Sequence, residues 1–88
     1  MTKIKSVSPE YKHRIEKIGG VIGGLSDAAG PELYEACYMI AILTRHEDID
    51  WVLDYIRDNF KQRFLGLTTS KAIITSFSRK YRGAKSLL

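Results

Sequence analysis

The stretch IEKIGGVIGGLSDAAGPE, from Ile15 to Glu32, contains five of the chain's seven glycines and decides how the fold is read. Apolar residues recur through it at alternating steps of four and three, at Tyr11, Ile15, Ile18, Ile22, Leu25 and Ala29. This spacing is typical of the packing seam of a helix. Ser8, Pro9 and Glu10 supply a helix start. The pattern therefore predicts one helix from Pro9 to Ala29 with the glycine cluster inside it.

Glycines inside a helix each cost up to about 1 kcal/mol relative to alanine, so four of them need a compensating gain. A bare backbone lets a second helix approach closely, as small-xxx-small motifs do in membranes. We therefore predict a self-association face formed by Ile18, Gly20, Ile22, Gly24 and Leu25. The alternative is a break near Gly19-Gly20 that joins two shorter helices. A phosphate-binding loop is disfavoured because Leu25-Ser26 follows Gly24, where a Walker A motif requires lysine.

A second helix is predicted from Pro31 to about Arg45, because Gly30-Pro31 suits the end of one helix and the first turn of the next. The segment LYEACYMIAIL is apolar almost all round. Such a helix must be central, and a chain of this length has few other elements to cover it. We therefore expect subunits to associate.

The acidic stretch HEDID, at residues 46–50, begins a third predicted helix, with Asp48 or Asp50 as the N-cap and Gly66 at the end. Its inward residues are predicted to be Ile49, Val52, Leu53, Ile56, Phe60 and Phe64. Glu47 and three aspartates fall on a separate face, flanked by two aromatic residues that either complete the core or anchor a partner. The partner-binding surface predicted from this arrangement consists of Asp50, Trp51, Asp54, Tyr55 and Asp58.

A basic amphipathic helix is predicted to follow the hydroxyl-bearing residues 67–70 and to end at Gly83, with Ile73 or Ile74, Phe77 and Tyr81 inward. After Asp58 the chain has seven Lys and Arg residues and no Asp or Glu. The alternative to a protein partner is therefore a nucleic-acid surface formed by Lys71, Arg79, Lys80, Arg82 and Lys85. A helix-turn-helix across FLGLTTSKAIITS would present it, although Gln62 stands where that motif favours a small residue.

The composition, 44% hydrophobic and 27% charged over 88 residues, indicates one globular domain. We predict an all-α domain of about four helices over residues 1–88, assembled as a dimer or tetramer, with a flexible segment 1–7 and a frayed tail 83–88. The single cysteine, Cys37, is expected to be buried and inert, which favours a cytoplasmic setting. No apolar run reaches membrane-spanning length, so no membrane partner is expected.

Few residues of the sequence are candidates for catalysis or for metal binding. His46-Glu47 resembles the start of HExxH, but Asp50 occupies the position of the second histidine ligand. His13 stands alone among charged residues. We therefore expect no enzymatic activity, no metal site and no cofactor.

The chain's length, its GGVIGG helix, the apolar LYEACYMIAIL and the basic SRKYRG together resemble the small helical antirepressor proteins of temperate bacteriophages. The resemblance implies a homo-oligomer that binds a phage repressor and removes it from its operator. We therefore expect a small non-enzymatic regulatory protein that binds a transcriptional repressor, with its acidic face as the contact. The alternative is a DNA-binding transcriptional regulator that uses the basic C-terminal helix.

Overall fold

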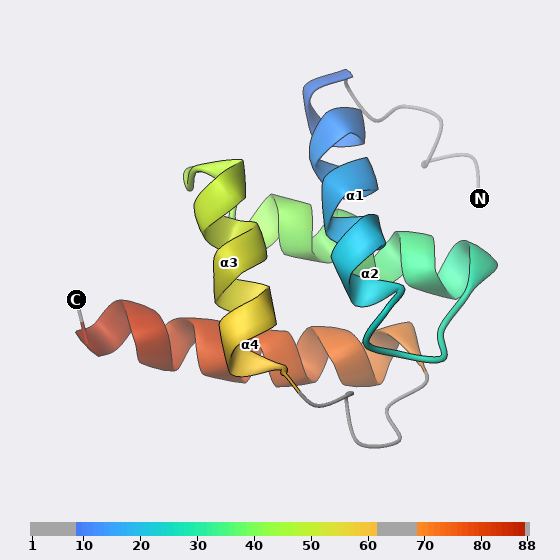
Figure 1. Cartoon of the computed structure of the whole chain (residues 1–88). Coiled ribbons are helices and arrows are strands. Elements are labelled where there is room, and N and C mark those ends of the chain that lie inside the picture. The colour runs from blue at the N-terminus through green and yellow to red at the C-terminus, as the bar shows by residue number, and fades with distance from the viewer. Residues whose placement is uncertain (1–8, 62–68, 88) are drawn as a thin grey trace.

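The computed structural model describes residues 9–61 and 69–87, except the side chains of residues 83–87, and these residues form four α-helices (Figure 1). The helices are α1 (Pro9–Ile22), α2 (Gly30–Leu43), α3 (Ile49–Asn59) and α4 (Ser70–Leu87). The predicted all-α class with four helices is confirmed. The predictions for residues 1–7, Ser8, Gln62, Phe64, Gly66 and Thr68 lie outside the described residues.

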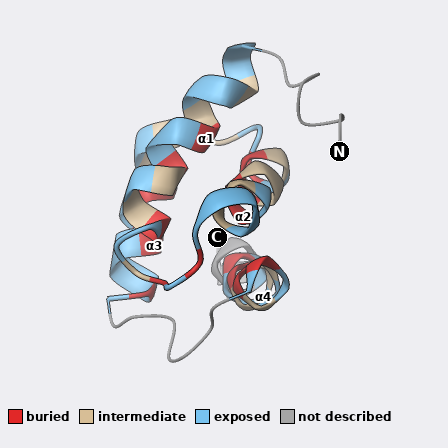
Figure 2. Cartoon of the chain, turned by 90° about the vertical axis from the view of Figure 1, so that its right-hand side faces the viewer, coloured by how far each residue is buried: buried red, intermediate tan, exposed pale blue. Residues whose placement is uncertain are grey.

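The helices form two layers of two (Figures 1 and 2). One layer contains α1 and α3, and the other contains α2 and α4, whose axes run across those of the first layer. Helix α2 packs on α1 on one side and on α4 on the other. This arrangement gives each helix an inner face towards the other layer and an outer face towards solvent.

The core lies between the layers and takes apolar side chains from every helix. Phe77, Ile18, Ile22, Ile40, Ile56 and Ile73 are the largest side chains that are fully buried. The residues predicted to face inward on α3 are mostly buried, with Ile49 partly so. On α4, Ile73 is fully buried and Ile74 is partly exposed, which resolves the choice between them.

Helix α1 is shorter than predicted, because it ends at Ile22 and not at Ala29. The alternative break at Gly19-Gly20 is also wrong, since both glycines are helical. Gly23 N still donates to Gly19 O at 2.9 Å, and the chain then tightens, since Gly24 N donates to Val21 O at 3.2 Å and Leu25 N to Ile22 O at 2.9 Å. Two adjacent residues of low helix propensity, Gly23 and Gly24, stand where the helix stops.

The starts of α2 and α3 follow the predicted signals. Pro31 lies in the first turn of α2, and Gly30 before it has a φ of +60°, a conformation that glycine adopts without steric cost. At α3 the carboxylate of Asp48 accepts hydrogen bonds from the backbone N–H of Asp50 and Trp51. Asp48 is therefore the N-cap.

The ends of α3 and α4 differ from the prediction. Helix α3 stops at Asn59, whose side-chain Nδ2 donates to Tyr55 O at 2.9 Å and satisfies a carbonyl of the last turn. Helix α4 continues through Gly83 to Leu87, so the predicted frayed tail is helical up to that residue. One interior glycine costs only about 1 kcal/mol, which is too little by itself to end a helix.

The prediction that α2 is central is correct, and the chain's own helices bury its inner residues Ala36, Cys37, Ile40 and Ala41. Its apolar residues Tyr34, Tyr38, Met39 and Ile42 are partly exposed. In the part of the chain that the structure describes, Leu43 is the one large hydrophobic residue that is exposed, at 41%. Part of the apolar surface of α2 therefore stays outside the core of the single subunit.

Candidate functional site

The outer face of α4 carries exposed basic side chains. Lys71, Arg79 and Arg82 are exposed, and Thr75 and Ser78 lie between them. At about 100° per residue, steps of four, three and four from Lys71 through Thr75 and Ser78 to Arg82 keep these residues on one side of the helix. The inward residues Ile73, Phe77 and Tyr81 occupy the opposite side. We call Lys71, Thr75, Ser78, Arg79 and Arg82 the α4 stripe.

Two of the five predicted nucleic-acid residues are not part of the α4 stripe. Lys80 is exposed but is turned about 100° from Arg79, towards a different side of the helix. Lys85 belongs to the last turns of α4, and its side chain lies outside the described part of the structure.

The expected helix-turn-helix between the third and fourth helices is wrong. Helix α3 ends at Asn59 and α4 begins at Ser70. That motif joins its helices by a turn of about three or four residues, whereas residues 60–69 separate these two. The outer face of α4 is therefore presented by packing against α2 (Figure 2) and not by a helix-turn-helix.

Both halves of α4 are tied to the layer structure by polar contacts. Near its start, the Ser70 hydroxyl donates to Glu35 Oε1 at 3.0 Å, and Thr69 Oγ1 accepts a hydrogen bond from Ala72 N at 3.3 Å as an N-cap. Three turns later the Tyr81 hydroxyl donates to Glu47 Oε2 at 3.0 Å. The hydrogen bonds from Ser70 to Glu35 and from Tyr81 to Glu47 hold α4 in one rotation about its axis, so the α4 stripe faces outward.

Glu47 belongs to a partly buried polar network that the sequence pattern did not reveal. Arg14 donates through Nη1 to Glu47 O at 3.1 Å and through Nη2 to Thr44 O at 2.6 Å. The Thr44 hydroxyl, fully buried, donates to Ile40 O at 2.7 Å. A half-buried arginine among charged neighbours gives no periodic signal, and the pairing spans more than thirty residues, so the sequence pattern could not reveal it.

The predicted partner-binding surface on α3 is corrected at its aromatic residues. Tyr55 is buried, at 8% exposure, and Trp51 is half-buried and stacks on it with ring centroids 5.3 Å apart. Phe77 and Tyr81 of α4 complete this aromatic cluster. Burial, and secondarily the nearby Tyr81 phenol, raises the pKa of Tyr55. Asp50, Asp54 and Asp58 remain exposed.

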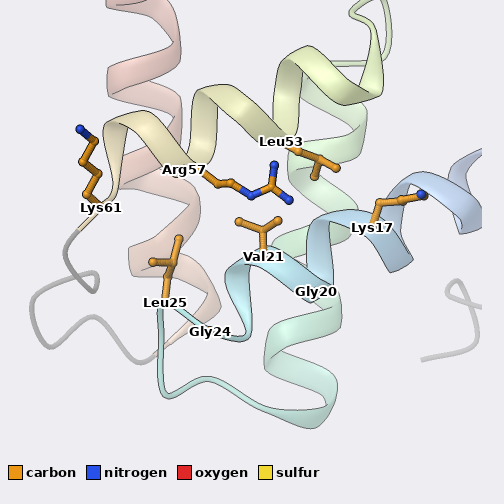
Figure 3. A pocket seen from close by; sticks show the side chains of 8 residues that line it. All are labelled: Lys17, Gly20, Val21, Gly24, Leu25, Leu53, Arg57 and Lys61. Atoms are coloured by element: carbon orange, nitrogen blue, oxygen red, sulfur yellow. The ribbon is translucent and has the colours of Figure 1, made fainter.

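The predicted self-association face is also corrected. Ile18 and Ile22 are fully buried in the chain's own core and are not available to a partner. Gly20 and Gly24 are exposed and Leu25 is half-buried. These three residues line an open groove between α1 and α3 (Figure 3).

We call this hollow the α1–α3 groove. It encloses about 580 Å³ and is lined by Lys17, Gly20, Val21, Gly24, Leu25, Leu53, Arg57 and Lys61. Val21 points up from α1, and the Arg57 side chain extends over it from α3 (Figure 3). Lys17 and Lys61 stand at opposite ends. The groove therefore combines an apolar floor with three cations.

Among the described residues, Cys37 and the groups that could bind a metal ion are further candidates for a site. Cys37 is 1% exposed, and burial raises the pKa of its thiol from 9.0 to about 12, so the nucleophilic thiolate is strongly disfavoured. Across residues 9–61 and 69–82, no three His, Cys, Asp or Glu side chains gather closely enough to hold a metal ion. None of the described helices has the length and apolar composition needed to cross a membrane.

Comparisons with protein-family models, with curated proteins and with solved structures find no match to this chain. The surfaces described above are therefore interpreted from their own geometry and charge.

Proposed function

We propose that the chain is a small DNA-binding regulator whose α4 stripe contacts the phosphate backbone of duplex DNA. The observation that carries the proposal is the exposure of Lys71, Arg79 and Arg82 on one side of a helix that contains no acidic residue. Lys and Arg neutralise phosphates and release condensed counterions, and this supplies most of the sequence-independent affinity for DNA.

The shape and chemistry of the α4 stripe suit this role. Lys71 and Arg82 are eleven positions apart, which corresponds to roughly 16 Å along a helix axis. Thr75 and Ser78 place hydroxyl donors between the cations, and such groups commonly bond phosphate oxygens. The exposed face of a helix fits a major groove about 12 Å wide or lies along its edge.

The protein-partner alternative has weaker support. Its predicted aromatic anchor Tyr55 is buried, which leaves three exposed carboxylates on α3. The antirepressor hypothesis, in which such an acidic face displaces a repressor from its operator, remains a proposal. A chain without affinity for DNA that captures a repressor would favour it.

Fluorescence anisotropy with a labelled mixed-sequence duplex of about twenty base pairs tests the proposal over a range of salt concentrations. We expect binding that weakens steeply as salt rises. In the double variant Arg79→Ala/Arg82→Ala, the slope of log K against log salt should fall in magnitude by about two, because each lost phosphate contact removes about one.

Lys12→Ala is the matched control, since Lys12 is an exposed cation on α1, away from the α4 stripe. It should leave the slope nearly unchanged. Circular dichroism checks that each variant remains helical. Equal slopes for the wild type and the double variant, or no binding by the wild type at low salt, would contradict the proposal.

A further inference from the structure

The glycines of the α1–α3 groove are not explained by the chain's own packing. A Cβ atom added at Gly20 would meet nothing within 4 Å, and one at Gly24 would meet only Val21 O at 3.7 Å. By contrast, a Cβ at Gly23 would lie 2.9 Å from Gly19 O, so glycine is needed there for internal reasons. Gly20 lowers helix propensity without relieving any crowding inside the molecule.

The charges around the α1–α3 groove have both signs. Lys17, Arg57 and Lys61 line it. Asp50, Asp54 and Asp58 are exposed on α3, the helix that carries Leu53 and Arg57. Asp54 lies 3.3 Å from Arg57 in an exposed ion pair. An acidic partner would be attracted by the lysines but repelled by these carboxylates, whereas a surface with both signs can complement a copy of itself.

We propose that the α1–α3 groove is the contact face of a homodimer, in which the cations of one subunit face the α3 carboxylates of the other. A two-fold axis places the same surface on both sides of an interface, so that surface must be self-complementary. The bare backbone at Gly20, and at Gly24 just beyond the end of the helix, lets the two α1 segments approach closely. The apolar contact comes from the half-buried Val21 and Leu25, with the buried Leu53 beneath them.

The dimensions of the molecule suit such an interface. The fold measures 36 × 29 × 18 Å. Helices α1 and α3 together form one of its two layers (Figure 2). A standard interface buries about 800 Å² per partner, which a face of this size can supply.

Charge-swap complementation tests the dimer by sedimentation equilibrium at up to about 200 µM protein, because association depends on concentration. One variant carries Lys17→Glu and Lys61→Glu, and the other carries Asp54→Lys and Asp58→Lys. Each alone should raise the dimer Kd by more than about tenfold, because like charges then face one another. A mixture of the two should form a heterodimer more tightly than either variant forms a homodimer.

Gly20→Leu places a bulky side chain in the groove, at a position where an added Cβ atom would meet nothing within 4 Å. We expect a monomer with unchanged or higher helix content. Lys12→Glu, which reverses a cation outside the groove, should leave the dimer intact.

A wild-type chain that stays monomeric at the highest concentration would overturn the inference. So would a dimer that tolerates Gly20→Leu and both charge reversals, because its interface would then lie elsewhere. This inference does not depend on DNA binding, since the two surfaces are probed by different variants and different readouts.

Discussion

Gly20 and Gly23 stand three residues apart, yet the structure gives their absent side chains different surroundings. The Cβ position of Gly20 is open, whereas that of Gly23 is crowded by the backbone oxygen of Gly19. The four glycines of GGVIGG could not be told apart from the sequence, because composition and spacing do not reveal which atoms a Cβ at each position would contact. Only two of the four, Gly20 and Gly24, line the groove.

Alanine substitutions at Gly20 and Gly23 should have opposite effects on the free energy of unfolding. Gly20→Ala is expected to raise the free energy of unfolding by about 0.5–1 kcal/mol, because alanine has the higher helix propensity and room for its methyl group. Gly23→Ala is expected to lower it, because backbone must shift. Urea denaturation at low micromolar protein measures both without a contribution from association. Two changes of the same sign would contradict this account of the glycines.

Cys37 should be unreactive in the native protein. Burial raises the pKa of its thiol from 9.0 to about 12, so the neutral form is favoured by folding. The burial of the neutral thiol therefore contributes to the free energy of unfolding. That contribution is complete below pH 9 and is lost as the pH rises from about 9 towards 12. We expect iodoacetamide at pH 8.5 to label unfolded chains far faster than native ones, as measured by mass spectrometry. Equal labelling rates in both states would mean that the thiol is accessible.

Helix starts were predicted more accurately than helix ends. Pro31 and Asp48 act through local chemistry, a fixed φ and a side-chain cap, that any chain with these residues can form. The end of α1 depends on a turn that closes after Ile22, and the end of α3 depends on Asn59 reaching back to Tyr55 O. Apolar spacing continued past both points, at Leu25 and Phe64, and gave no sign of these turns.

The Asp48 cap should make a measurable contribution to stability. Its carboxylate accepts from Asp50 N at 2.8 Å and from Trp51 N at 3.3 Å. Asp48→Ala is expected to lower the free energy of unfolding by about 1 kcal/mol, while Asp48→Asn should lower it much less because the amide oxygen still caps. Thermal and urea unfolding measure both. An alanine variant as stable as the asparagine variant would show that the cap contributes nothing.

At the scale of the whole molecule, the sequence predicted the class of fold but not which faces stay outside. The seam through Ile18 and Ile22 was correctly predicted to pack, but the structure places both residues in the chain's own core and not at a contact with another subunit. Tyr55 was assigned to a partner and lies in the aromatic cluster with Phe77 and Tyr81. Periodicity identifies an apolar face, whereas the element that covers it is decided by tertiary packing.

The basic helix was the most predictable candidate site, because Arg and Lys on a helix with a single apolar stripe have no inward place. Even there, the prediction grouped Lys80 with Arg79 and Arg82, although Lys80 lies on a different side of the helix. The α1–α3 groove could not be predicted, since it brings residues of the first helix beside Leu53, Arg57 and Lys61. Its existence depends on the way the two helices of one layer are spaced.

The central claim is that the outer face of α4 meets DNA, and the most direct measurement is an NMR titration of the isotope-labelled chain with a mixed-sequence duplex. The account predicts that the backbone amide signals of Thr75, Ser78, Arg79 and Arg82 shift most, while those along α3 stay nearly unchanged. Shifts concentrated on α3 or in the α1–α3 groove, with the α4 signals unmoved, would contradict it.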